Sequence, residues 1–346
     1  MMKSLVLATV VALVALARPA LADDKILIAG GSTATGFFEV IENTAQLGGF
    51  YKEEHLDVEK QYVGSAGLAA QLVASGKVDI ATFSIEPIII GYDKGVHLLA
   101  FFSQDPQYDY ALGVLVNSPI KTLADFKGTT LGEIASNSPV EYSVNAMLEG
   151  AGLRKGDVSY IPIGTGAQAI SALTTGKVAG AAFPSPELAL YEAMTPTRFR
   201  YFRHPILKDV PNLAYVSSPA TIQAKSEILK RFLRAHVMAS IFVRENPLVA
   251  ARYFVQGAGM KVTDEAVQNE YRLLLLSQDQ LAGVNPMSNK IGEVRVRELD
   301  FYAKFLYENG AAPTLVPAAN FTTNQFIAYG NDFDHAAFIA RAKAVK

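Results

Sequence analysis

GSAGLAAQLVASGKVDIATFSIEP, from Gly64 to Pro87, is the stretch that decides the fold, because it returns in weaker form 100 positions later, from Gly164. The two copies align without a gap. The matched positions are Gly64 and Gly164, Ala69 and Ala169, Gly76-Lys77-Val78 and Gly176-Lys177-Val178, Ala81 and Ala181, and Phe83 and Phe183. A fixed offset over this length indicates that one supersecondary unit occurs twice.

The pattern within each copy is that of a β-α-β unit. In the first copy a β-prone run at 58–63 precedes the Gly/Ser loop, and apolar residues then recur at helical spacing. Gly76 suits the end of that helix, and 78–83 begins a second strand. We expect the strands of a unit to lie parallel in one sheet. Free N–H groups at the loop can bind a small polar or anionic group, so two copies predict two lobes around one ligand.

The composition describes a large folded protein without cysteine chemistry. Half of the 346 residues are hydrophobic, 18% are charged and the formal net charge is -2. This length allows two domains, and the charge gives no indication of a nucleic-acid partner. The absence of cysteine from the sequence excludes disulfides, Cys-based zinc sites, thiol catalysis and a lipid-anchored cysteine.

The N-terminus has the pattern of a secretory signal peptide. Lys3 precedes an apolar run at 5–17, and the small residues at 20–22 resemble a cleavage site. The run is short for a bilayer core of roughly 30 Å, so we expect a cleaved signal over residues 1–22 and not an anchor. Cleavage after Ala22 would release a free protein outside the cytoplasmic membrane.

The remaining chain continues the α/β pattern. A Gly/Ser/Thr loop at 30–36 follows a first strand at 26–29, and it lacks the Gly-Lys-Ser/Thr ending of a phosphate loop. The segment at 197–204, TRFRYFRH, allows an anion- or nucleic-acid-binding patch, but an amphipathic edge strand is the favoured interpretation. Expected further elements are strands at 96–102, 129–134 and 213–217 and helices at 221–244, 247–256, 263–277 and 290–309.

Several blocks together resemble a known family. They are GFYKEEHLDVE at 49–59, the repeated block at 64–83, TLADFKGTTLG at 122–132, AMLEGAGL and DVSYIPIG within 146–164, and NFTTNQF at 320–326. The sequence resembles periplasmic substrate-binding proteins of ABC importers. Within that group it is most similar to the family for nitrate, sulfonates, taurine and thiamine-pyrimidine precursors.

The resemblance implies a type II, two-lobed α/β fold with a ligand cleft between the lobes and two hinge strands. Residues 23–112 and 213–346 would form the first lobe, and 113–212 the second. The protein would be a monomer that closes over a small molecule and docks on an inner-membrane permease. The resemblance implies no cofactor, metal or nucleic-acid partner.

The family's ligand-binding loops map onto fourteen residues of this sequence. In the first lobe they are Ser32, Thr33, Thr35, Phe37, Ser65, Ala66, Ser84 and Glu86. In the second lobe they are Ser136, Asn137, Ser138, Thr165, Ser185 and Glu187.

The chemistry of these loops favours a neutral or amine-bearing ligand. None of them contains Lys or Arg, whereas Glu86 and Glu187 provide acceptors that need a donor when buried. A pyrimidine-like molecule flanked by an aromatic side chain such as Phe37, Tyr108 or Phe183 would fit. The alternative is a sulfonate- or nitrate-type anion, held by backbone N–H groups or by Arg203 or His204.

Enzyme and sensor functions are the competing classes. A related fold builds the thiamine pyrimidine, but that activity is associated with a Cys-rich motif, and this sequence has no cysteine. The five histidines show no zinc-type spacing, and no GxSxG elbow is present. A regulator's ligand-sensing domain would carry a DNA-binding helix-turn-helix, which the sequence lacks. We therefore expect a binding protein and not an enzyme.

Overall fold

The computed structural model describes residues 23–32, 39–104, 110–134, 140–154, 156–204, 210–277 and 289–346. The expected signal peptide at 1–22 lies outside these residues. Within the described part of the chain, no helix is long and apolar enough to cross a membrane.

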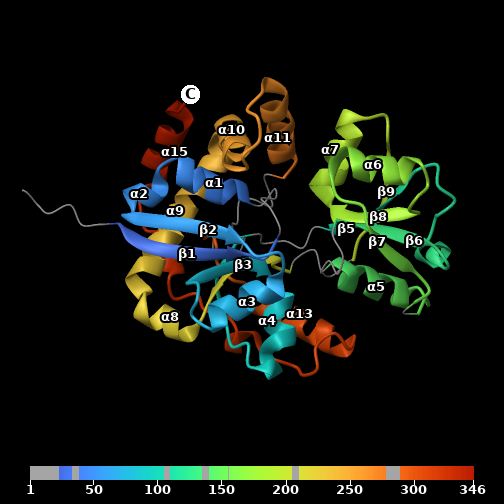
Figure 1. The fold of residues 1–346 in the computed structure, drawn as a ribbon, viewed down its shortest axis with the longest axis horizontal. Helices are drawn as coiled ribbons and strands as arrows, with labels where there is room; N and C mark the ends of the chain where they lie inside the picture. The colour runs from blue at the N-terminus through green and yellow to red at the C-terminus, as the bar shows by residue number, and fades with distance from the viewer. Residues whose placement is uncertain are drawn as a thin grey trace, which may run out of the picture.

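Two five-stranded sheets organise the described residues (Figure 1). The first has the order β2-β1-β3-β10-β4 and the second the order β7-β6-β8-β5-β9. The strands of the first sheet are β1 (Asp24–Gly30), β2 (Leu56–Tyr62), β3 (Ile80–Ser84), β4 (Leu99–Ser103) and β10 (Leu213–Ser217). Those of the second are β5 (Tyr110–Leu115), β6 (Thr130–Glu133), β7 (Ser159–Pro162), β8 (Gly180–Pro184) and β9 (Phe199–Phe202).

The repeated sequence forms the same unit in both sheets, as predicted. The first copy is β2, α3 (Ala66–Ala74) and β3, and the second is β7, α6 (Gly166–Thr174) and β8. In each copy the two strands lie parallel on either side of a third strand, β1 or β6. Gly64 and Gly164 both adopt positive φ, 82° and 64°, as a turn between strand and helix requires.

Two antiparallel strands occupy equivalent places in the two sheets. β10, predicted at 213–217, returns to the first sheet and pairs with β3 and β4. β5 enters the second sheet and pairs with β8 and β9. β9 lies at the edge of its sheet, which confirms the edge-strand interpretation of 197–204.

Helices cover both sheets. The α-helices are α1 (Val40–Leu47), α2 (Phe50–Glu53), α4 (Glu86–Gly91), α5 (Val140–Gly150), α7 (Ser185–Met194), α8 (Pro219–Ala224), α9 (Ser226–Glu245), α10 (Pro247–Gly257), α11 (Asp264–Leu276), α13 (Val296–Glu308), α14 (Ile327–Gly330) and α15 (His335–Ala344). Short 3-10 turns are η2 (Tyr92–Lys94), η3 (Leu123–Phe126) and η5 (Ala318–Asn320).

Two helix predictions were wrong. The predicted helix at 221–244 is divided into α8 and α9, because Lys225 leaves helical geometry with φ -113° and ψ 26°. The helix predicted from 290 begins only at Val296. Asn289 and Gly292 have positive φ, 56° and 81°, which interrupts a right-handed helix at that point.

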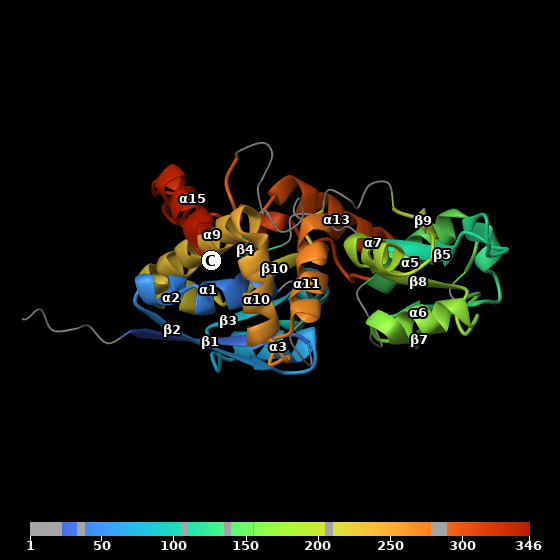
Figure 2. The same ribbon diagram turned by 90° about the horizontal axis from the view of Figure 1, so that it is seen from above.

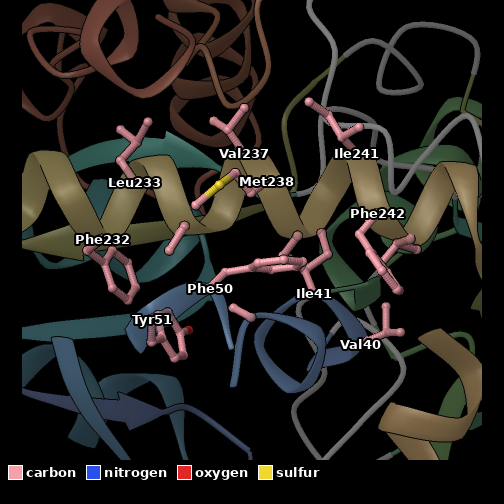
Figure 3. Packing of buried hydrophobic residues seen from close by; sticks show 14 of the residues in the cluster. Val40, Ile41, Phe50, Tyr51, Phe232, Leu233, Val237, Met238, Ile241 and Phe242 are labelled. Atoms are coloured by element: carbon pink, nitrogen blue, oxygen red, sulfur yellow. The ribbon is translucent and has the colours of Figure 1, made fainter. Parts of the chain in front are cut away.

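The large core of the first lobe forms between the first sheet and α9 (Figure 3). Phe232 of α9 stacks on Tyr51 of α2 with ring centroids 6.0 Å apart. Phe50 contacts both Phe242 of α9 and Phe338 of α15 through its ring. Helices α10 and α11 add their apolar faces to the same core, as expected for helices that wrap this lobe.

A buried polar network crosses this core. Tyr215 of β10 donates a hydrogen bond to Oε1 of Glu42 over 2.6 Å, and the hydroxyl lies 3.0 Å from Nε2 of His236. Lys60 of β2 reaches Oε2 of Glu42 at 2.5 Å. Burial works to lower the pKa of Lys60, but the carboxylates of Glu42 and Glu39 outweigh burial and raise it. The network therefore keeps a lysine charged inside the first lobe.

Replacing Glu42 by alanine is expected to destabilise the protein strongly. The change leaves the charge of Lys60 without its closest partner and removes the acceptor of Tyr215, a combination that costs about 3 kcal/mol or more. Urea unfolding measures the loss. Lys25→Ala is the matched control, because it breaks an ion pair with Glu59 whose side chains are 60% and 53% exposed. Similar losses in both variants would contradict a structural role for the network.

Candidate functional site

The loops that follow β1, β2 and β3 meet at one edge of the first sheet. Ser32 accepts a hydrogen bond through its carbonyl from Gly64 N–H at 2.9 Å, and Gly31 N–H donates to Thr82 O at 3.1 Å. A Cβ atom on Gly31 would lie 3.0 Å from the Cα of Ala66. A side chain at position 31 would crowd the backbone of Ala66, so glycine favours this close approach of the two loops. In Figure 1 β1 runs from the N-terminal end of the described chain toward the second sheet, so the loops that follow it face that sheet.

Three predicted residues of the first lobe lie at this edge. Ser32 and Ser65 are exposed, and Ala66 is half-buried at the start of α3. Ser65 caps α3, because its Oγ accepts the N–H of Leu68 at 3.2 Å. The structure thus brings the ends of β1 and β2 to one exposed edge.

Ser84 and Glu86 differ from these residues in their burial. Ser84 ends β3 with 8% of its surface exposed, and Glu86 is only 1% exposed. The hydroxyl of Tyr302 in α13 donates to Oε1 of Glu86 over 2.6 Å. Burial raises the pKa of Glu86, although the hydrogen bonds from Tyr302 and Ser84 act against it. The Glu86 carboxyl is therefore held against α13 inside the first lobe.

The corresponding edge of the second sheet contains a linked set of polar groups. Thr165 is exposed at the start of α6, and Gly166 N–H donates to the Tyr191 hydroxyl at 2.7 Å. That hydroxyl in turn donates to Oε1 of Glu187. Burial raises the pKa of Glu187, opposed by the hydrogen bonds from Tyr191 and from the backbone of Gly166. The first turn of α7 thus presents a half-buried carboxyl with a raised pKa.

Arg203 is a basic residue close to a predicted site residue. Its Nε donates to Oγ of Ser185 at 3.2 Å, and its guanidinium lies 4.7 Å from the ring centroid of Tyr201. The predicted loops contain no basic residue, but Arg203 reaches one of them from the end of β9. This contact supports the alternative in which Arg203 supplies positive charge to bind an anion.

Lys60 is a second basic residue close to this edge of the first sheet, and it lies in none of the predicted loops. Its Cε lies 2.8 Å from the position of a Cβ on Gly30, at the end of β1. The charge is already engaged by Glu42 at 2.5 Å and by Glu39 at 3.4 Å. Its place on β2 could have been found from the alternation of the strand, since Lys60 shares a face with Leu56 and Val58.

The other predicted residues do not define the site geometry. Thr33, Thr35, Phe37, Tyr108, Ser136, Asn137 and Ser138 lie outside the described residues. Phe183 is fully buried in the second lobe's core. Among the described residues, no group of three or more His, Cys, Asp or Glu side chains could hold a metal ion.

Comparisons with solved structures define the class of fold. Residues of this chain superimpose on a protein of Bordetella bronchiseptica RB50 with 23% identity and a TM-score of 0.69, covering 89% of this chain and 97% of that one. The alkanesulfonate-binding protein SsuA of Xanthomonas axonopodis pv. citri, bound to MOPS, matches with 14% identity and a TM-score of 0.64 over 86% and 98% of the two chains. The periplasmic aliphatic sulphonate-binding protein SsuA of Escherichia coli matches with 17% identity and a TM-score of 0.62, covering 86% of this chain and 91% of that one.

The fold is therefore that of the two-lobed periplasmic binding proteins. The family model described as "NMT1/THI5 like" matches residues 41–250, well over half of the chain. The chain belongs to the NMT1/THI5-like family. A search of curated protein sequences found no match.

The two copies of the repeated unit allow a paired test of the loops. Ser65→Ala removes the side-chain cap of α3 and is expected to cost about 1 kcal/mol in the free energy of unfolding. Thr165→Ala changes the equivalent residue of α6, whose side chain makes no capping hydrogen bond, so a smaller loss is expected. Chemical denaturation of the two variants checks this, and equal losses would show that the cap of α3 is not what stabilises the loop.

Proposed function

We propose that this protein is an extracytoplasmic solute-binding protein, which captures a small polar molecule between two lobes and delivers it to an ABC importer permease. The observation that carries the proposal is that the same loop, beginning at Gly64 or Gly164, lies at one edge of each sheet within the binding-protein fold. Residues 23–112 and 213–346 would form one lobe and residues 113–212 the other. The chain passes between the sheets after β4 and again before β10, an arrangement suited to hinge closure.

The proposed location is the periplasm, after cleavage of a signal peptide behind Ala22. Lys3, the apolar run at 5–17 and the small residues at 20–22 support export, and so does the periplasmic location of a structural neighbour. The protein would act as a monomer and would bind its solute without chemical conversion. The sulfonate-binding proteins that share this fold support a binding function.

The first ligand candidate is a neutral or amine-bearing molecule, of which an aminopyrimidine is an example. Glu187 favours it, because a half-buried carboxyl with a raised pKa gains from a donor or a cation on the ligand. Its neighbours Tyr191 and Gly166 fix the orientation of this carboxyl.

The second candidate is a sulfonate-type anion. Arg203 favours it, because its guanidinium contacts Ser185 at the start of α7, where helix N–H groups also attract negative charge. The sulfonate-binding proteins among the structural neighbours support the same candidate.

A thermal-shift screen of the refolded protein tests the function and separates the candidates. A solute at about a hundred times its dissociation constant adds about 2.7 kcal/mol of stability. The panel would set aminopyrimidines and amines against alkylsulfonates and nitrate. A solute bound through the acid is expected to lose about tenfold in affinity in Glu187→Gln, as one hydrogen bond to a charged group would predict. A solute bound through the cation is expected to lose a similar factor in Arg203→Gln.

Glu227→Gln is the control, because this residue lies on the exposed side of α9 with a 74% exposed side chain. A hit that ignores both site variants would contradict the proposed ligand contacts. The absence of any stabilising solute from a broad panel of small polar molecules would contradict the binding function itself.

A further inference from the structure

A cavity of about 310 Å³ lies between α7 and the α10–α11 hairpin. Leu190 of α7 lines one side, and Val255, Met260 and Glu270 line the other. Helix α7 packs in the core of the second sheet, whereas α10 and α11 pack in the core of the first. Both views of the molecule place α11 beside α7 (Figures 1 and 2). The cavity is thus shared by the two halves of the protein.

Glu270 gives the cavity its chemistry. Its Oε1 is buried and has no hydrogen-bond partner among the described residues. Burial alone raises the pKa of this carboxyl to about 8. An unpaired buried carboxyl is costly, and neither α7 nor the α10–α11 hairpin supplies a described basic residue to the cavity lining. A ligand could therefore supply the hydrogen-bond donor that Oε1 of Glu270 lacks among the described residues.

We propose that this cavity binds a primary ammonium group carried on a short aliphatic chain of the solute. The ammonium would donate to the carboxyl of Glu270, and the chain would lie along Leu190, Val255 and Met260. The volume is at the small end of the range for ligand pockets, so a compact ligand fits. The inference rests on the proposed solute-binding function and adds the chemical class of one part of the solute.

Alternative occupants agree less well with the lining. A divalent cation needs several oxygen ligands, and the described residues contain no cluster of three acidic or histidine side chains. An anion would meet two carboxyls, Glu265 and Glu270, without a basic residue in the described lining. An apolar molecule would leave the Glu270 carboxyl unpaired. An ammonium group needs no cluster of oxygen ligands, carries no negative charge and pairs with the Glu270 carboxyl. It also favours the ionised form of that carboxyl.

A ligand that contacts both halves of the protein would also affect how close the two halves lie. An ammonium compound that touches Leu190 on α7 and Glu270 on α11 binds best when these helices are close. It therefore stabilises the arrangement in which the two lobes approach each other, which is the state a closed binding protein adopts around its solute.

The test uses n-butylammonium as the probe and n-butanol as its uncharged match, with binding measured by calorimetry and by thermal shift. Wild-type protein is expected to bind butylammonium and to ignore butanol. Glu270→Gln is expected to weaken butylammonium binding by about 30-fold or more, as the loss of a buried charge partner does. Glu227→Gln is the control and is expected to leave butylammonium binding unchanged, since this residue lies on α9 outside the cavity lining and its side chain is 74% exposed.

A second variant tests the cavity from the opposite side, without changing Glu270. Leu190→Phe reduces the cavity from the α7 side, leaves Glu270 intact and is expected to weaken butylammonium binding as well. Unchanged binding in Glu270→Gln, or equal responses to butylammonium and butanol, would overturn the proposal. Stabilisation of wild type and Glu270→Gln alike by an alkylsulfonate, with no response to butylammonium, would overturn the cavity assignment and leave the solute-binding function standing.

Discussion

The hydrogen bond from Gly64 N–H to the carbonyl of Ser32 joins the loops that follow β2 and β1. The geometry of the site depends on this close approach of the loops. Strands β2 and β3 flank β1 in parallel, so all three strands end at one edge and their loops must share the same space. Gly31 and Gly64 make this possible, the first through its missing Cβ and the second through positive φ. The same strand arrangement in the second sheet produces a second edge of the same kind.

Because the loops are fixed by backbone contacts, the side chains on them can vary in role. Ser65 uses its hydroxyl to cap α3, whereas Thr165 at the equivalent place makes no such bond. Glu86, which is buried, and Glu187, which is half-buried, diverge in a similar way. Glu86 is held by Tyr302 from α13, and Glu187 is held by Tyr191 from its own helix. The repeated unit thus supplies the scaffold, while the chemistry of each edge comes from neighbouring elements.

This division explains how far the sequence could be interpreted. The repeat, β10 and the edge position of β9 were predictable, because they rest on local pattern and a constant offset. The break at Lys225 was not, since a single residue leaves helical geometry between two helical patterns. The contact of Arg203 with Ser185 and the cavity position of Glu270 were missed for a different reason. Each depends on tertiary packing between segments that the sequence does not pair.

The electrostatics of the two halves follow from burial more than from net charge. In the core of the first lobe Lys60 keeps its charge because Glu42 lies 2.5 Å away. Glu187 and Glu270 have no described basic partner, and burial raises the pKa of both. Burial raises the pKa of Glu270 to about 8, so a cation that favours its ionised form binds with release of a proton. Selectivity for the solute's charge would then arise from which buried group the lobes bring to it, and not from the overall charge of -2.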